Sequence, residues 1–209
     1  MQFSFSIILP IKNLNQSKTR LRDSLSNNKI KNLTLNLMAQ TINVALEAKV
    51  SNVLIISSDK TIESKLTKDK VTFVYQEDED LNKAIKNGFE ISFSKNQIPI
   101  FLPCDLPLIN KNNIKNIKNI MNKNFDVCIA PSKSDFGTNS LAWSNEKKDL
   151  FYGFFGKNSY KKYTEYFSKN NLNYFKLFDS ELSFDLDTTK NLNHLKKTNN
   201  QIYKNLLLK

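Results

Sequence analysis

Apolar and polar positions alternate along the chain in short blocks whose period changes between that of a strand and that of a helix. Compact apolar runs bounded by polar residues predict buried strands at 5–10 (FSIILP), 53–57 (VLIIS), 71–75 (VTFVY), 99–103 (PIFLP) and 125–131 (FDVCIAP). Apolar residues spaced three and four apart predict helices over 29–50, 80–92 and 110–123. Asp80 is the expected N-cap of the second of these helices, and Ser58 with Asp59 can cap a short helix after the second strand.

Strands that alternate with helices predict right-handed crossovers and a largely parallel sheet with helices on both faces. After about residue 131 the rhythm changes to a strand ending near Trp143, an aromatic segment leading into an amphipathic helix, a strand over 173–178 and a C-terminal helix from about Thr188. We expect this last third to form an α/β cap that carries an antiparallel strand. The sequence contains no repeat or linker, so we predict one domain over residues 1–209.

Composition narrows the class of protein. The chain has 209 residues, of which 40% are hydrophobic, too many for a disordered chain. No apolar run approaches the roughly 20 residues of a membrane-spanning helix. The first residues predict a strand rather than a signal peptide. Cys104 and Cys128 lie in apolar runs without metal-type neighbours, which predicts free thiols in a cytoplasmic protein.

The formal net charge of +11 raises the question of nucleic-acid binding. The positive charge is scattered lysine mixed with asparagine, and no basic stripe with interleaved aromatic residues is present, so we expect no nucleic-acid partner. Such a surface favours a small anionic substrate instead. The two arginines, Arg20 and Arg22, share one short stretch, and three of the four glycines are Gly137, Gly153 and Gly156. Their clustering indicates local binding functions, because arginine offers a planar fork to anions and glycine lets a ligand approach the backbone.

Candidate chemistry gathers at one predicted edge, because ligands of open parallel sheets bind beyond the carboxyl ends of the strands. The residues expected there are Lys12, Lys18, Arg20, the acidic segment 76–82 (QEDEDLN), Asp105, Asp135, Asp185 and Asp187. Asp105 with Asp185 or Asp187 could hold Mg²⁺, which takes one or two carboxylates and completes its shell with water and phosphate oxygens. Lys12, Lys18 and Arg20 could then bind a triphosphate.

Structural interpretations of the same residues stay open at this point. Asp105 could be a turn or N-cap residue ahead of the helix near 111, and Asp187 the N-cap of the last helix. Asp185 could be a simple strand-end residue, and Lys12 a solvated lysine.

Several familiar motifs are missing from the sequence. There is no P-loop, no Gly-x-Gly-x-x-Gly fingerprint and no serine elbow, and the single histidine, His194, lies in the terminal helix pattern. Chemistry without a histidine base fits phosphoryl or nucleotidyl transfer, in which the protein supplies positioning and charge neutralisation.

Six short blocks carry a resemblance to a known family. They are PIKNLNQSKTRL near the start, EDLNKAI (79–85), LPCDLPLI (102–109), DFGTNSL (135–141), FGKNSY (155–160) and FDLDTTKNL (184–192). In this order they resemble the 2-phospho-L-lactate guanylyltransferase family, which includes phosphoenolpyruvate and 3-phospho-D-glycerate guanylyltransferases of deazaflavin coenzyme (F-420) biosynthesis.

The resemblance implies a three-layer α/β nucleotidyltransferase fold of the GT-A, Rossmann-like type, with a mostly parallel sheet and one antiparallel strand. The implied reaction couples GTP to a small phosphorylated carboxylic acid and releases pyrophosphate. Thr138, Gly156 and Ser159 would contact the acid, and Asn82 would lie near the nucleotide. Asp105 and one aspartate of FDLDT would bind Mg²⁺, while Lys12, Lys18 and Arg20 would meet the triphosphate.

Departures from the family pattern bear on the acid. Phe136 replaces the first of two glycines, Lys157 and Asn158 enter the FGPGSF block, and DTPEDL becomes DTTKNL. They leave the choice among 2-phospho-L-lactate, phosphoenolpyruvate and 3-phospho-D-glycerate open. The oligomeric state also stays open, and a homodimer is one possibility. The alternatives are a molybdopterin or sugar-phosphate nucleotidyltransferase and a non-catalytic nucleotide-binding domain.

Overall fold

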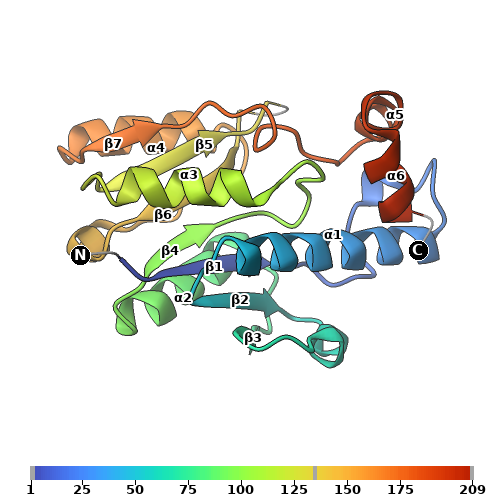
Figure 1. Cartoon of the computed structure of the whole chain (residues 1–209), viewed down its shortest axis with the longest axis horizontal. Helices are drawn as coiled ribbons and strands as arrows, with labels where there is room; N and C mark the ends of the chain where they lie inside the picture. Colours follow the sequence, from blue (N-terminus) through green and yellow to red (C-terminus); the bar gives the residue numbers. More distant parts are fainter. Residues whose placement is uncertain (1–2, 134–135, 208–209) are drawn as a thin grey trace.

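A seven-stranded mixed sheet forms the centre of the molecule (Figure 1) in a computed structural model that describes residues 3–133 and 136–207. The strands are β1 (Phe5–Pro10), β2 (Asn52–Ser57), β3 (Val71–Tyr75), β4 (Ile98–Phe101), β5 (Val127–Pro131), β6 (Thr138–Trp143) and β7 (Tyr174–Lys176). Their order is β3-β2-β1-β4-β6-β5-β7, and β6 runs antiparallel to both β4 and β5 while the other pairs are parallel. The predicted fold class, with one antiparallel strand, is confirmed. The last third contributes β6 and β7 to this same sheet.

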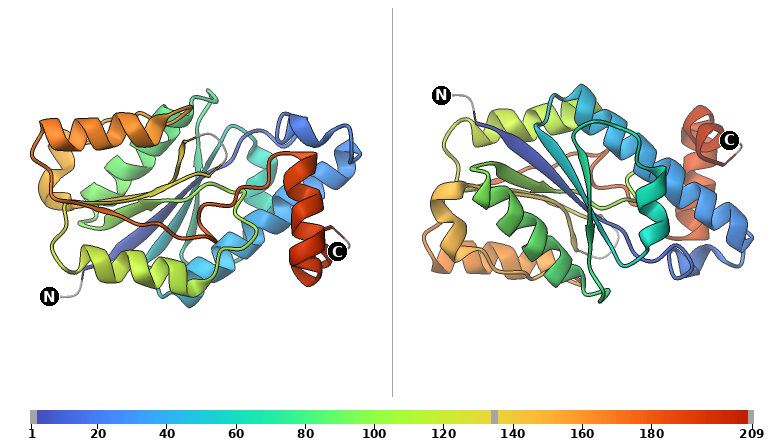
Figure 2. Two further views of the ribbon diagram at one scale, coloured as in Figure 1. Left: turned by 90° about the horizontal axis from the view of Figure 1, so that it is seen from above. Right: turned by 90° about the horizontal axis from the view of Figure 1, so that it is seen from below.

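Helices cover both faces of the sheet, which gives three layers (Figure 2). The helices are α1 (Asn27–Glu47), α2 (Leu81–Ser94), α3 (Lys111–Met121), α4 (Ser159–Lys169), α5 (Thr189–Thr198) and α6 (Asn200–Leu207), with short 3₁₀ turns η1 (Thr19–Leu21), η2 (Lys60–Lys65) and η3 (Asn145–Leu150). Buried side chains of α1 and α3 pack on one face, and those of α2 and α4 on the other. Of the helices in the described residues, none combines the length and apolar character that a membrane crossing requires.

Local signals explain where the helices begin. The Asp80 carboxylate accepts hydrogen bonds from the backbone N–H groups of Asn82 and Lys83, so its predicted capping role is confirmed. Asp59 likewise caps η2. The N-cap of α3 is Asn110, in a reciprocal pair with Asn113, and Asp105 takes no part in it.

The C-terminal segment differs from the prediction of one helix, because the helix breaks at Asn199 into α5 and α6. Thr188, not Asp187, is the N-cap of α5. Leu192, Leu195 and Leu206 of these helices pack against Leu33 of α1 in a third buried cluster. This contact secures the preceding segment, which contains Asp185 and Asp187, beyond the carboxyl edge of the sheet.

Gly88 allows α2 to lie directly on the sheet. A Cβ atom at this position would come within 2.4 Å of Ile8 Cγ2 and 2.8 Å of Ile56 Cδ1. Although alanine has the better helix propensity, we expect Gly88→Ala to lower the free energy of unfolding by about 1–3 kcal/mol because it overpacks the core. Urea denaturation measures this, with Asn87→Ala on the same helix as the control; a stabilised Gly88→Ala variant would contradict the prediction.

Candidate active site

The first loop, residues 11–22, is held at the carboxyl edge by acidic side chains of the next two loops. The Leu14 N–H donates to Asp59 Oδ2 at 3.1 Å, and the Asn13 N–H donates to Glu79 Oε1 at 3.3 Å. Burial alone would raise the pKa of Asp59, but hydrogen bonds from Thr61 and from the Leu14 N–H outweigh it, and the pKa lies below its ordinary value. These bonds fix the loop that carries the predicted cations.

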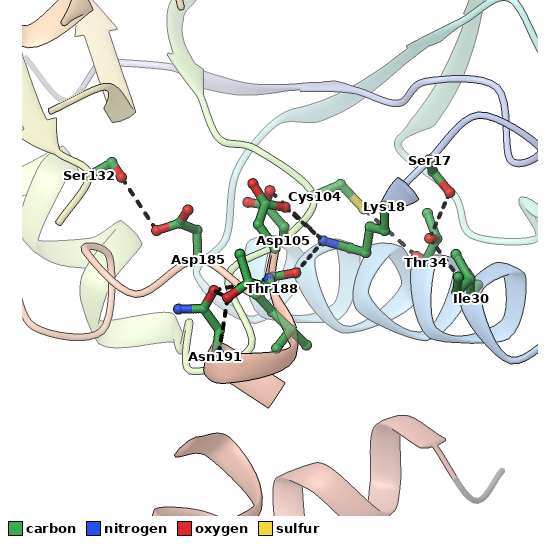
Figure 3. Close-up of polar contacts among 12 residues, drawn as sticks. Ser17, Lys18, Ile30, Thr34, Cys104, Asp105, Ser132, Asp185, Thr188 and Asn191 are labelled. Atoms are coloured by element: carbon green, nitrogen blue, oxygen red, sulfur yellow. Dashed lines mark hydrogen bonds and ion pairs between the residues drawn. The ribbon is translucent and has the colours of Figure 1, made fainter. Parts of the chain in front are cut away.

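Lys18 points inward from this loop to the acidic side of the cleft (Figure 3). Its ammonium donates to the Leu186 carbonyl at 2.7 Å and lies 3.5 Å from Asp187 Oδ1 and 3.9 Å from Asp105 Oδ2. The side chain is only 7% exposed, and the residue adopts a left-handed backbone conformation with φ of 46°. Such strain in a non-glycine residue is found at functional sites, where the surroundings compensate for it.

Asp105 follows β4 and faces Lys18. One carboxylate oxygen, Oδ1, is buried and has no hydrogen-bond partner among the described residues. Burial raises the pKa of Asp105 to about 7; Lys18 opposes this shift, and Asp187 and Asp185 add to it. A carboxylate that lacks a full set of partners and lies near two other acids is suited to receive a cation.

The two late aspartates have different places. Asp187 lines the cleft together with Asp105, whereas Asp185 is buried and accepts a hydrogen bond from Ser132 Oγ at 3.3 Å (Figure 3). Asp185 still raises the pKa of Asp105, so it lies within electrostatic range. The backbone brings these segments together, since the Leu186 N–H donates to the Asp105 carbonyl at 2.9 Å.

A cleft of about 490 Å³ connects the basic and acidic groups. Its lining includes Lys12, Lys18, Thr19, Arg20, Thr34, Leu81, Phe101, Cys104, Asp105 and Asp187. The structure thus brings together the three predicted cations and two of the three predicted carboxylates. Within residues 3–133 and 136–207, no group of three or more Asp, Glu, His or Cys side chains forms a complete metal cage. Asp135 lies outside the described residues.

Thr138, Gly156 and Ser159 form a second group at the start of α4. Ser159 Oγ donates to Thr138 Oγ1 at 2.9 Å, and both residues are buried. Gly156 has φ of +124°, a conformation suited to glycine, and a Cβ atom there would meet only open space. Open space beside a helix N-terminus is a favourable place for an anion.

Asn82 contacts Phe155, which lies between the cleft and the group formed by Thr138, Gly156 and Ser159. Its Oδ1 accepts from the Phe155 N–H at 2.8 Å, and its Nδ2 donates to the Phe155 carbonyl at 3.2 Å. The Phe155 ring packs edge-on against Phe101, at 4.5 Å between centroids, and Phe101 lines the cleft. Phe155 and Asn82 both stand in blocks that carry the family resemblance, FGKNSY (155–160) and EDLNKAI (79–85), but nothing in either block predicts the contact between them.

The fold places a basic first loop opposite carboxylates, across a cleft at the edge of a mixed α/β sheet. The fold is similar to that of a protein from Desulfovibrio desulfuricans G20 described as a nucleotide-diphospho-sugar transferase, with a TM-score of 0.80 at 18% identity over 98% of this chain and 94% of that one. A family model described as "Guanylyl transferase CofC like" matches residues 5–209.

Two curated relatives carry the name 2-phospho-L-lactate guanylyltransferase. The protein from Methanocaldococcus sp. (strain FS406-22) is 37% identical over 90% of this chain and 80% of its own length. That from Methanocaldococcus jannaschii is 35% identical over 97% of this chain and 87% of its own length. The chain therefore belongs to the CofC-like guanylyltransferase family, and the predicted family and enzyme class are confirmed.

Proposed function

We propose that this enzyme transfers GMP from GTP to the phosphate of a small phosphorylated carboxylic acid and releases pyrophosphate, as a step of F-420 biosynthesis. 2-Phospho-L-lactate is the first candidate acid, because it appears in the names of the relatives. The observation that carries the proposal is the convergence of Lys18, Asp105 and Asp187 in one cleft with Lys12 and Arg20. Such a site matches a nucleoside triphosphate with a bound cation.

The basic residues are assigned to the triphosphate. Arg20 presents a planar fork and Lys12 a mobile ammonium at the exposed side of the cleft, while Lys18 reaches the inner end. The acid is assigned to the start of α4, where Gly156 leaves space and Ser159 and Thr138 offer hydroxyl groups. Phosphoenolpyruvate and 3-phospho-D-glycerate fit the same chemistry and are the other candidate acids.

The residues present fit Mg²⁺. Asp105, with a buried oxygen that lacks a partner, and Asp187, on the cleft wall, are the proposed ligands, and Asp185 supports them electrostatically. Two carboxylates without a complete protein cage suit an ion that keeps water and phosphate oxygens in its shell. When bound, the ion would supply charge neutralisation at the phosphates.

The chain's own contribution is positioning and charge. An anionic phosphate oxygen of the acid attacks the α-phosphorus of GTP, the bond from that phosphorus to the bridging oxygen of the β-phosphate breaks, and pyrophosphate leaves. The nucleophile is already anionic, so no side chain has to remove a proton. The single histidine, His194, is exposed on α5 and is assigned no role.

A pyrophosphate-release assay tests the proposal. Purified protein is mixed with ATP, CTP, GTP or UTP and with each of the three acids, with and without Mg²⁺. We expect release only with GTP, one of these acids and the cation present. Turnover only with a sugar phosphate or a molybdopterin, or GTP binding without turnover for any acceptor, would overturn it.

A further inference from the structure

Asn82 has both polar groups of its side chain directed at one backbone unit. The amide oxygen accepts from the Phe155 N–H at 2.8 Å, and the amide nitrogen donates to the carbonyl of the same residue at 3.2 Å. The backbone of Asn82 is held in turn by the Asp80 carboxylate at the start of α2. A side-chain amide is well matched to this task, because it holds an acceptor oxygen and an NH₂ donor group side by side in one fixed plane.

The contact between Asn82 and Phe155 requires a glycine at position 153. A Cβ atom at residue 153 would lie 2.8 Å from Asn82 Oδ1 and 3.2 Å from its Cβ. Only a glycine therefore lets the segment pass Asn82 at this distance. This accounts for one of the rare glycines of the chain without a ligand.

Two other contacts hold the same segment from the α4 side. The Phe154 N–H donates to the Tyr163 hydroxyl at 3.1 Å, and the Phe155 ring packs on Tyr163 at 5.3 Å. Asn82 acts from the opposite side, and its neighbour Leu81 lines the nucleotide cleft. The peptide that ends at Gly156 is thus fixed between α2 and α4.

We propose that Asn82 is a positioning residue that fixes the Phe155–Gly156 peptide and so shapes the site for the acid, without touching the nucleotide. The inference rests on the proposed function for the identity of the acid. It differs from the expectation that Asn82 lies near the nucleotide, because the amide oxygen and one amide N–H are already bonded to Phe155.

The test uses Asn82→Ala, Asn82→Asp, Gly153→Ala and the double variant Asn82→Ala/Gly153→Ala, with Asn87→Ala on the same helix as the control. Asn82→Asp is isosteric and keeps the acceptor, but it places an oxygen against the Phe155 carbonyl. We expect the KM for 2-phospho-L-lactate to rise about tenfold in Asn82→Ala and Asn82→Asp, while the Kd for GTP without acid changes less than about twofold. Asn87→Ala should match the wild type.

Amide hydrogen exchange of the ligand-free protein gives a readout that needs no substrate. The Phe155 amide should exchange faster in Asn82→Ala than in the wild type. Gly153→Ala should raise both the exchange rate and the KM, and it should raise them less in the Asn82→Ala background, because the contact with Oδ1 is then absent.

Three results would overturn the inference: unchanged exchange at Phe155, a lowered Tm with an unchanged KM for the acid, or a weaker Kd for GTP with an unchanged KM. If the wild type turns over none of the three acids, the proposed function fails. The exchange rates of Phe155 and the coupling with Gly153 then still decide whether Asn82 fixes this peptide.

Discussion

Asp105→Asn is expected to lower turnover by about a thousandfold while the protein still folds, because the substitution removes charge and keeps shape. Asp105 faces Lys18 and lies within electrostatic range of the late aspartates, and its buried Oδ1 lacks a partner among the described residues. An asparagine oxygen there is a much weaker ligand for a divalent cation than a carboxylate. The loss should therefore appear in kcat at saturating GTP and Mg²⁺.

The same substitution, Asp105→Asn, should stabilise the protein at high pH although it lowers turnover. The pKa of Asp105 is about 7 in the folded protein against an ordinary value of 3.8, so the folded state is disfavoured progressively as pH rises from about 4 through 7. Asparagine cannot ionise and removes this penalty. Without a divalent cation, the Tm of the variant should equal or exceed that of the wild type at pH 8, and the difference should shrink at pH 5.

Turnover and Tm are measured on the same preparations, with Asp149→Asn in the exposed η3 turn as the control. Wild-type turnover in Asp105→Asn would reject the role assigned to this carboxylate. A Tm well below that of the wild type at pH 8 would instead show that Asp105 is needed for folding.

Interactions between near neighbours could be read from the sequence. Asp80 caps α2 two residues before Asn82, and apolar periodicity located the strands on which the sheet is built. The rule that ligands bind beyond the carboxyl ends of parallel strands predicted that the first loop meets Asp105 and Asp185 or Asp187 at one edge, and Lys18 does lie close to Asp105 and Asp187. These predictions succeeded because each depends on local pattern or on a general rule of chain topology.

Contacts between distant segments could not be read in the same way. The bond from Lys18 to the Leu186 carbonyl joins residues 168 positions apart, and a backbone carbonyl leaves no mark in the sequence. Nor could the hydrogen bond from Ser132 to Asp185 be predicted, since nothing in the sequence distinguishes Ser132 from other serines. The break at Asn199 went unpredicted because α5 and α6 are set by packing on α1 rather than by a strong helix stop.

Lys18→Met is expected to impair both activity and stability. The buried ammonium is the cation nearest to Asp105 and Asp187, and its loss leaves two carboxylates facing each other. We expect the free energy of unfolding at pH 8 to fall by about 2 kcal/mol, less than for a fully buried pair because Asp187 is 41% exposed. We expect kcat/KM for GTP to fall by about a hundredfold, because the contact proposed between Lys18 and the triphosphate would be lost.

The dependence of the stability loss on pH and on Mg²⁺ identifies its cause. Lys18 lowers the pKa of Asp105, so without Lys18 the carboxyl stays protonated to higher pH. The loss of unfolding free energy in Lys18→Met should therefore be large at pH 8 and small at pH 5. Mg²⁺ should raise the Tm of Lys18→Met more than that of the wild type, because the ion replaces the missing positive charge. Lys12→Met is the matched control for stability, since Lys12 is exposed on the same loop and should leave the Tm unchanged. A loss of stability that is equal at both pH values and insensitive to Mg²⁺ would show that Lys18 stabilises the loop by packing alone.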